Sequence, residues 1–366
     1  MLHLHMKHKV LFLSFLIASA ASSQTLLGVA IDVRGTDIVV PSGNPNNMLG
    51  YEGYAYAPSI IQDGDYYHMF YCSTGNGTDT LWDYVRHSVS RDGVVWSKPN
   101  IVITPSHLDA VNGERCACDP SVVKFGGQWY LYYGGNHSKS GGEIYVAKSN
   151  SLWGGFAKLS KRGTWENNPP DPKPIISPTI ANSNTYGAGQ PSAVVINGTI
   201  HIWYTDNSAY NPSEGGRRHH TSSTDGTNFT AGTEITVMGA KKPFEADNGE
   251  VKWSPKLNKY LMFDMNSYYG PGPQLGMLTS VDGLDWTAPQ SLGVMPDYSF
   301  NIGVSGDALG WVDLRKYFVS MGVPWDYDGN ANPSDTHRWN LVSVAMAGSF
   351  PKRSRFMAWS APLLTE

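Results

Sequence analysis

The chain has 366 residues, of which 41% are hydrophobic and only 16% are charged, so it can bury a core and wholesale disorder is excluded. Its net charge of −4 excludes the basic surface of a nucleic-acid-binding protein. Aromatic residues make up 12% of the chain, with 39 glycines and 23 prolines, which is typical of many strands joined by many turns.

The first 23 residues have the pattern of an export signal. Two lysines precede an apolar run over residues 10–17, and small residues suited to cleavage follow at 18–20. The apolar run is too short to span a bilayer, and no later segment is long enough. We therefore expect a signal peptide over 1–23 and a secreted or periplasmic protein with a single domain over 24–366.

The three cysteines are Cys72, Cys116 and Cys118. Export permits a disulfide, and Cys72 ends a predicted strand that faces the next part of the fold. We therefore expect Cys72 to pair with Cys116 or with Cys118. The spacing of Cys116 and Cys118 is too tight for zinc and no matching second pair exists, so we expect no metal site and no cofactor.

A hairpin unit recurs five times along the chain. Each copy has a short apolar strand, a tight turn and an alternating strand rich in aromatic residues, which is a strong hairpin pattern. The copies begin at Pro58, Pro120, Pro191, Glu250 and Ala308. In the fifth copy, residues 308–312 are the expected first strand and residues 317–321 the second.

A second repeat alternates with the first. It has the pattern Ser-x-Asp-Gly-x-x-aromatic and begins at Ser90, Ser223 and Ser280. The aspartate caps a tight turn and the glycine accepts a positive φ, so we interpret these residues as structural. Together the two repeats predict an all-β fold, a five-bladed β-propeller of four-stranded antiparallel blades, with a closing strand from residues 25–50.

The predicted connections differ between the two faces of the propeller. The turns after the first and third strands of each blade are short, whereas those after the second strand are long and contain aromatic and acidic residues. Long loops on one side of a rigid scaffold are where function is usually found. We therefore expect the working site on the long-loop face.

One segment resembles a known family. Cys118-Asp119-Pro120-Ser121 and the strand pair that follows, to Tyr133, resemble the second blade of five-bladed glycoside hydrolases, most closely glycoside hydrolase family 43 and its relatives, including the fructan-acting families. The segment 187–192, Gly-Ala-Gly-Gln-Pro-Ser, resembles another blade of family-43-like proteins. The resemblance implies acidic residues at the starts of the inner strands, where two carboxyl groups flank the scissile bond.

The resemblance also assigns candidate catalytic residues. Asp119 matches an acid that orients its catalytic partner and tunes its pKa. Ala57 stands where a base or nucleophile is expected, and Gln190 stands where family 43 often has its acid, although an amide cannot donate a catalytic proton. Replacement carboxylates lie near two inner-strand starts. The catalytic candidates are therefore Asp119, Glu52, Asp247 and Glu250.

Carbohydrate is the expected partner, bound by aromatic and polar side chains around the axis. The substrate-binding candidates are Gln190, Arg115, Tyr186, Trp82 and Trp325. The sequence predicts a secreted, monomeric glycoside hydrolase acting on a poly- or oligosaccharide with pentose or furanose units. A non-catalytic carbohydrate-binding propeller is the alternative. A sialidase-like hydrolase is the third reading, because the Ser-x-Asp-Gly turns resemble the Asp boxes of sialidases.

Overall fold

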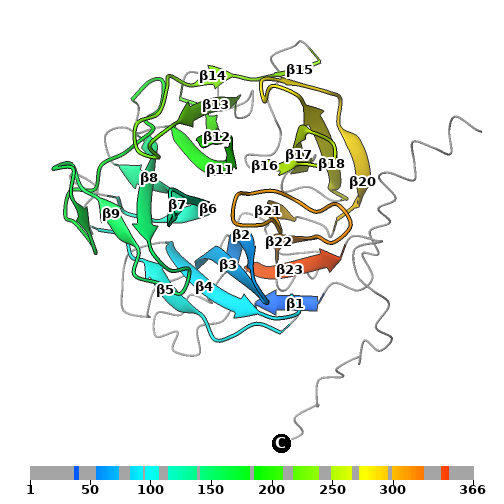
Figure 1. The fold of residues 1–366 in the computed structure, drawn as a ribbon, viewed down its shortest axis with the longest axis horizontal. Helices are drawn as coiled ribbons and strands as arrows, with labels where there is room; N and C mark the ends of the chain where they lie inside the picture. The colour runs from blue at the N-terminus through cyan, green and yellow to red at the C-terminus, as the bar shows by residue number, and fades with distance from the viewer. Residues whose placement is uncertain are drawn as a thin grey trace, which may run out of the picture.

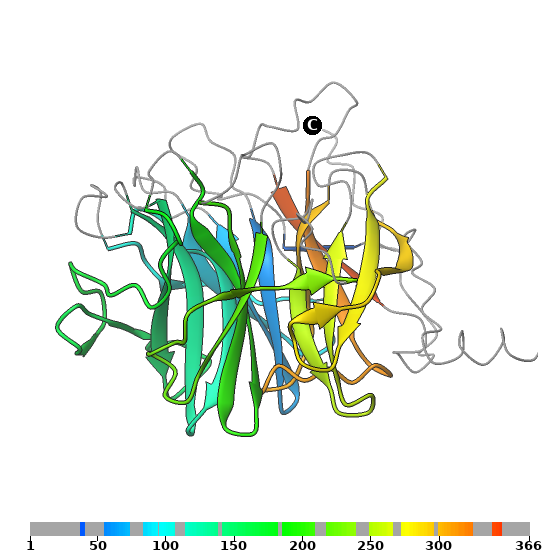
Figure 2. The ribbon, with the colours of Figure 1, turned by 90° about the horizontal axis from the view of Figure 1, so that it is seen from above.

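The computed structural model describes residues 37–40, 55–73, 83–93, 95–106, 114–137, 141–181, 185–208, 217–238, 249–265, 272–295, 299–324 and 339–345. Every regular element in these residues is a strand, so the all-β prediction is confirmed for the described part. Within the same residues no helix is long and apolar enough to cross a membrane. Figure 1 shows the sheets arranged around a common centre, as in a β-propeller, and Figure 2 shows the same sheets from the side.

Four sheets have the four antiparallel strands of the predicted blade. The first contains β2 (Ala55–Asp63), β3 (Tyr66–Ser73), β4 (Tyr84–Ser90) and β5 (Asn100–Ile103). The second contains β11 (Ala188–Ile196), β12 (Thr199–Asp206), β13 (Arg217–Ser223) and β14 (Thr233–Glu234). The third contains β16 (Glu250–Ser254), β17 (Lys259–Met265), β18 (Gln274–Ser280) and β20 (Gln290–Val294). The fourth contains β21 (Phe300–Val304), β22 (Phe318–Pro324), β23 (Trp339–Ala345) and β1 (Asp37–Val40).

A further sheet differs from the predicted four strands because it has five. It contains β6 (Cys118–Phe125), β7 (Gln128–His137), β8 (Gly141–Ser149), β9 (Ala157–Leu159) and β10 (Trp165–Glu166). The extra strand β10 arises because residues 157–166 fold back as a short hairpin on the outer edge. A two-stranded parallel pairing joins β15 (Thr236–Val237) to β19 (Asp285–Trp286) across two neighbouring sheets.

The N-terminal strand closes the ring, as the sequence predicted. Strand β1 pairs antiparallel with β23, so the last sheet combines the two ends of the described chain. The first strands of the sheets, β2, β6, β11, β16 and β21, lie innermost, and each contacts its neighbours around the axis. Gly303 on β21 is needed for one of these contacts, because a Cβ there would lie 2.0 Å from the carbonyl oxygen of Pro58.

The recurring serine after each inner proline links neighbouring blades. The Ser59 hydroxyl accepts from Val122 N at 3.3 Å, and the Ser121 hydroxyl accepts from Ala193 N at 2.9 Å. The third link repeats the pattern, with Ser192 Oγ 2.8 Å from Val251 N. Glu250 therefore occupies the position in the next blade that serine occupies in the others. These links explain the Pro-Ser repeat, since each satisfies a buried backbone donor between sheets.

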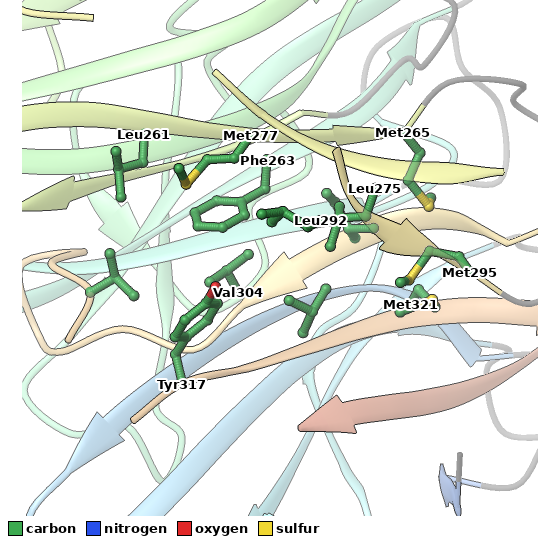
Figure 3. Packing of buried hydrophobic residues seen from close by; sticks show 13 residues of the cluster. Leu261, Phe263, Met265, Leu275, Met277, Leu292, Met295, Val304, Tyr317 and Met321 are labelled. Carbon is green, nitrogen blue, oxygen red and sulfur yellow. The ribbon is translucent and has the colours of Figure 1, made fainter. Parts of the chain in front are cut away.

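Apolar side chains fill the space between adjacent blades. Figure 3 shows this packing between the β16–β20 sheet and the β21–β22 strands, where Phe263, Tyr317 and several methionines interdigitate. Such clusters are buried on both faces of each sheet, which is why the strands are so rich in apolar residues.

The far end of the axis is closed by the connection between β21 and β22. Along this segment, Gly306, Ala308, Leu309 and Gly310 each accept a backbone hydrogen bond from a different inner strand, at 2.7, 2.6, 2.9 and 3.1 Å. Residues 308–312 are therefore not the first strand of the last blade, as the repeat predicted. The first strand of the last blade is β21. Residues 306–312, which include the predicted strand, form a plug beneath the other blades.

Candidate functional site

Four of the inner strands begin with a bulge that holds one residue in the left-handed region. These residues are Ala57, Asp119, Gln190 and Asn301, with φ values of 49°, 48°, 53° and 50°. The ladder register shifts at each of them. A left-handed non-glycine residue costs on the order of 1 kcal/mol or more, and bulges commonly re-aim a side chain beside an active site. Prolines follow Ala57, Asp119 and Gln190, and they suit the bulges because proline has no N–H to donate.

The strand starts converge on a pocket of about 20 Å³. It is lined by Ala57, Pro58, Asp119, Pro120, Gln190, Pro191, Gly249, Glu250 and Ile302. Residues from five different strands or strand starts therefore meet there, as the propeller topology predicted. Two of the four catalytic candidates, Asp119 and Glu250, line this axial pocket. Because the plug at residues 306–312 closes the other end, the pocket opens on the face from which the inner strands begin.

Two side chains donate hydrogen bonds to the half-buried carboxylate of Asp119, and a disulfide lies beside it. The Asn301 side-chain amide donates to Oδ1 at 3.2 Å, and the Tyr186 hydroxyl donates to Oδ2 at 3.1 Å. A disulfide joins Cys72 to Cys118, and Cys118 Sγ lies 3.4 Å from Oδ1 of Asp119. This bond is one of the two pairings expected from the sequence, and Cys116 takes no part in it.

Glu250 is buried and already has a charged partner. Its carboxylate forms an ion pair with Lys252, which is 2% exposed, and accepts from Ser192 Oγ at 3.2 Å. Burying a lone ammonium would be costly, so Glu250 compensates the charge of Lys252 inside the axis. Glu250 therefore lines the pocket and also stabilises the buried charge of Lys252.

Gln190 presents an unsatisfied acceptor to the axial pocket. Its side chain is 5% exposed, and Oε1 has no hydrogen-bond partner among the described residues. A buried amide oxygen without a donor costs about 1–3 kcal/mol. A ligand hydroxyl at the pocket would satisfy it, and the substrate-binding role of Gln190 stays a prediction.

The remaining candidates fall in different places. Tyr186 reaches Asp119 because Gly189 has no side chain, since a Cβ there would lie 2.5 Å from the Tyr186 hydroxyl. Tyr186 is 41% exposed, as a residue at the rim should be. Arg115 is exposed and does not line the axial pocket. The other four candidates lie outside the described residues: Glu52, Asp247, Trp82 and Trp325.

A second buried carboxylate, Glu114, lies away from the axial pocket. It pairs with Lys158 and accepts from Tyr133 at 3.2 Å and from Ser106 at 2.5 Å. Burial lowers the pKa of Lys158, and the charge of Glu114 opposes that shift. Lys158 also donates to the Thr104 carbonyl, so this cluster ties the first two blades together. We assign it a structural role.

Donor atoms of Cys72, Cys118 and Asp119 lie within 4.8 Å of one another, a spacing that could suit a metal ion. The two sulfur atoms are joined in a disulfide, however, and only a thiolate is an effective ligand. The chemistry of the donor set therefore argues against a metal site at this position in the oxidised protein.

Asn301 was not foreseen from the sequence. It belongs to the weakest copy of the repeat and lacks the proline that marks the other bulges. Its contact with Asp119 joins residues 182 positions apart, so only the closure of the ring brings them together. The spacing of the other three bulges would not have found it. Each of those bulge residues lies at the same distance before the second strand of its blade, whereas in this blade the plug at residues 306–312 lies between the two.

Comparisons with known proteins extend these observations. No protein-family model matches the chain. An uncharacterised protein of Mycobacterium tuberculosis (strain CDC 1551 / Oshkosh) is 36% identical over 96 residues, which cover 25% of this chain and 30% of that protein. The chain therefore matches less than a third of the length of this curated relative.

Solved structures of similar fold include proteins whose names give an action on carbohydrates. An α-L-arabinofuranosidase from Podospora anserina in complex with cellotriose superposes with a TM-score of 0.56 at 12% identity, covering 84% of this chain and 94% of that one. A thermostable family-43 glycoside hydrolase superposes with a TM-score of 0.57 at 14% identity, covering 83% of this chain and 95% of that one. An N-acetylgalactosamine deacetylase from F. plautii in complex with blood group B trisaccharide superposes with a TM-score of 0.58 at 15% identity, covering 87% of this chain and 96% of that one. At these identities the likeness shows that the chain shares the β-propeller fold of these proteins, and the fold alone.

Proposed function

We propose that the chain is a secreted glycoside hydrolase on a five-bladed propeller, acting on a poly- or oligosaccharide with pentose or furanose units. The five-stranded sheet β6–β10 counts as a blade because its inner strand β6 belongs to the ring around the axis. The observation that supports the activity is that Asp119 and Glu250 line the same axial pocket. Glycoside hydrolysis needs two carboxyl groups flanking the scissile bond.

The surroundings of the two carboxylates suggest their roles. Asp119 accepts from Tyr186 and Asn301, which fixes its orientation toward the axis and suits a base that activates water or orients such a base. Glu250 is the second carboxylate at the pocket, and because its charge is compensated by Lys252, we assign it to positioning the sugar rather than to supplying net negative charge. Protonation of the leaving oxygen needs a further acid, and we assign that role to Glu52 or Asp247.

A non-catalytic carbohydrate-binding propeller is the second candidate. Ala57 and Gln190 occupy the bulges where the family resemblance implies a base and an acid, and neither side chain can transfer a proton. The unsatisfied Oε1 of Gln190 would bind a sugar hydroxyl equally well without cleavage. The sialidase-like reading has less support, because no arginine lines the described pocket.

The deciding experiment measures cleavage and binding on the same sugars. Purified mature protein would be incubated with aryl pentofuranosides, aryl pentopyranosides, arabinan, xylan and fructan oligosaccharides, with products identified by chromatography and NMR. Calorimetry on the same panel would report binding. Release of a sugar supports the hydrolase. Binding without release supports the second candidate. If the protein neither binds nor cleaves any of these sugars, both candidates are contradicted.

A further inference from the structure

The seam between the first two blades brings two sulfur atoms against the candidate catalytic residue. The disulfide joins Cys72, near the end of β3, to Cys118, at the start of β6. The backbone N–H of Asp119 donates to Cys72 Sγ at 2.9 Å. Its Oδ1 lies 3.4 Å from Cys118 Sγ and 3.9 Å from Cys72 Sγ. Both the backbone and the side chain of Asp119 therefore contact this bond.

The disulfide also accounts for the alanine in the first blade. Ala57, Cys72 and Cys118 form one buried cluster, and Ala57 occupies the bulge equivalent to that of Asp119. Sulfur atoms therefore pack beside the position where the family resemblance implies a second carboxylate. A carboxylate at position 57 would have to share this dry space with the disulfide and with Asp119, which is unfavourable for two like charges.

The backbone of Asp119 needs external support. Its φ of 48° is unfavourable for a residue with a side chain, and such conformations persist only where the surroundings impose them. The preceding residue is fixed by the covalent bond to Cys72, and the N–H of Asp119 is held by the sulfur of the same bond. The disulfide is therefore placed to set the direction in which the carboxylate points.

We propose that the Cys72–Cys118 disulfide is a positioning group for Asp119, so that reducing it inactivates the axial site without unfolding the propeller. The inference rests on the proposed function and goes beyond it, since it makes the site sensitive to dithiols. A dithiol reductant would transfer two electrons and two protons, forming its own disulfide and leaving two free thiols. The Asp119 N–H and carboxylate would then lose their fixed neighbour.

The test compares three proteins: the wild type before and after reduction with dithiothreitol, the double variant Cys72→Ala/Cys118→Ala, and Cys116→Ser. The last is the matched control, because it removes a thiol two residues from Cys118 and leaves the bond intact. For reduced wild type and the double variant we expect kcat to fall at least tenfold with KM little changed. For Cys116→Ser we expect no change. If the double variant does not fold, reduction of the folded wild type provides the same comparison.

A second measurement separates positioning from general loosening. The measurement is an NMR titration of ¹³C-carboxyl-labelled aspartate, with the Asp119 signal assigned through Asp119→Asn. The pH at which Asp119 titrates should change when the wild type is reduced and should be the same in Cys116→Ser as in the oxidised wild type. Unchanged kcat and unchanged titration after complete reduction would overturn the proposal. If the wild type cleaves no sugar, the proposed function fails instead, and the titration still decides whether the disulfide positions Asp119.

Discussion

The two ends of the propeller axis are built in opposite ways. At the open end, four strands begin with strained residues, the ladder is broken, and the buried oxygen of Gln190 has no partner among the described residues. At the closed end, the plug at residues 306–312 accepts backbone hydrogen bonds from β2, β6, β11 and β16, and Trp311 Nε1 donates to the Val195 carbonyl at 2.9 Å.

This difference separates function from stability within one ring of strands. Strained residues and unsatisfied polar atoms cluster at functional sites, whereas saturated hydrogen bonds stabilise the fold. Substitutions at the open end should therefore change turnover with little effect on the free energy of unfolding. Substitutions at the closed end should lower the free energy of unfolding with little effect on turnover. Four predictions test this contrast, in order of decreasing expected effect.

The largest effect is expected for Asp119→Asn at the open end. The amide keeps the volume but removes the charge, so turnover should fall by about 10³-fold or more, as is common when a catalytic carboxylate is neutralised. The free energy of unfolding should change little, because the side chain is half-buried. Kinetics on the best substrate and urea unfolding would measure both. Full activity in this variant would show that the site lies elsewhere.

The closed end should respond to Gly310→Val with a loss of stability. Gly310 has a φ of +78°, and a Cβ there would lie 2.9 Å from the Ala193 carbonyl oxygen. Backbone strain and overpacking together should lower the free energy of unfolding by about 2–4 kcal/mol. Gly64→Ala is the matched control, since its φ is +57° with no atom within 4 Å of the added Cβ. It should lose only about 1 kcal/mol through strain. Turnover by the folded fraction should be unchanged in both.

Between the two ends, a pair of stacked histidines recurs in two blades. His68 Nδ1 lies 3.0 Å from His87 Nε2, and His201 Nδ1 lies 3.0 Å from His220 Nε2. Burial lowers the pKa of His87 to about 4, with a further contribution from His68. Burial likewise lowers the pKa of His220 to about 4, with His201 adding to the effect and Asp282 opposing it.

These histidines predict that acid destabilises the protein. The unfolded state binds protons near pH 6.5 and the folded state only near pH 4, so this contribution is fully present above pH 6.5 and is lost as the pH falls toward 4. The expected loss between pH 7.5 and 5 is about 1–2 kcal/mol per pair. Urea unfolding at a series of pH values would measure it, and His87→Gln should flatten the dependence. An unchanged slope in that variant would contradict the assignment.

The sequence predicted the repeated parts of this molecule better than its exceptional ones. The Pro-Ser starts, the Ser-x-Asp-Gly turns and the closing strand could be predicted because each depends on local turn chemistry or on a repeat. The plug was mistaken for an inner strand because its apolar pattern is that of a strand, while its partners are four distant blades. Similarly, the orientation of Asp119 depends on a bulge and on Asn301, neither of which leaves a local pattern, and on a disulfide for which the sequence left two pairings open.

The smallest effect is expected for Asp225→Ala, in one of the Ser-x-Asp-Gly turns. Asp225 is the same residue type as Asp119 but has a different duty. Its Oδ1 accepts from Thr227 N and Asn228 N, both at 2.8 Å, and from the Ser223 hydroxyl at 3.0 Å. Partial burial alone would raise the pKa of Asp225, but the hydrogen bonds from Asn228, Thr227 and Ser223 outweigh it and hold the pKa well below its usual value.

Because the folded pKa of Asp225 is depressed, its contribution to stability is present above about pH 4 and is lost as the pH falls below that value. The turn is exposed, so the N–H groups released by Asp225→Ala can bond to water instead. The expected loss at neutral pH is therefore only about 1 kcal/mol, comparable to that of a helix cap. Asp282→Ala removes the equivalent aspartate of the next blade and should behave alike. Turnover should stay at the wild-type value in both, measured beside urea unfolding. A large loss of turnover in either variant would show that the aspartates of these turns, rather than the open end of the axis, perform the chemistry.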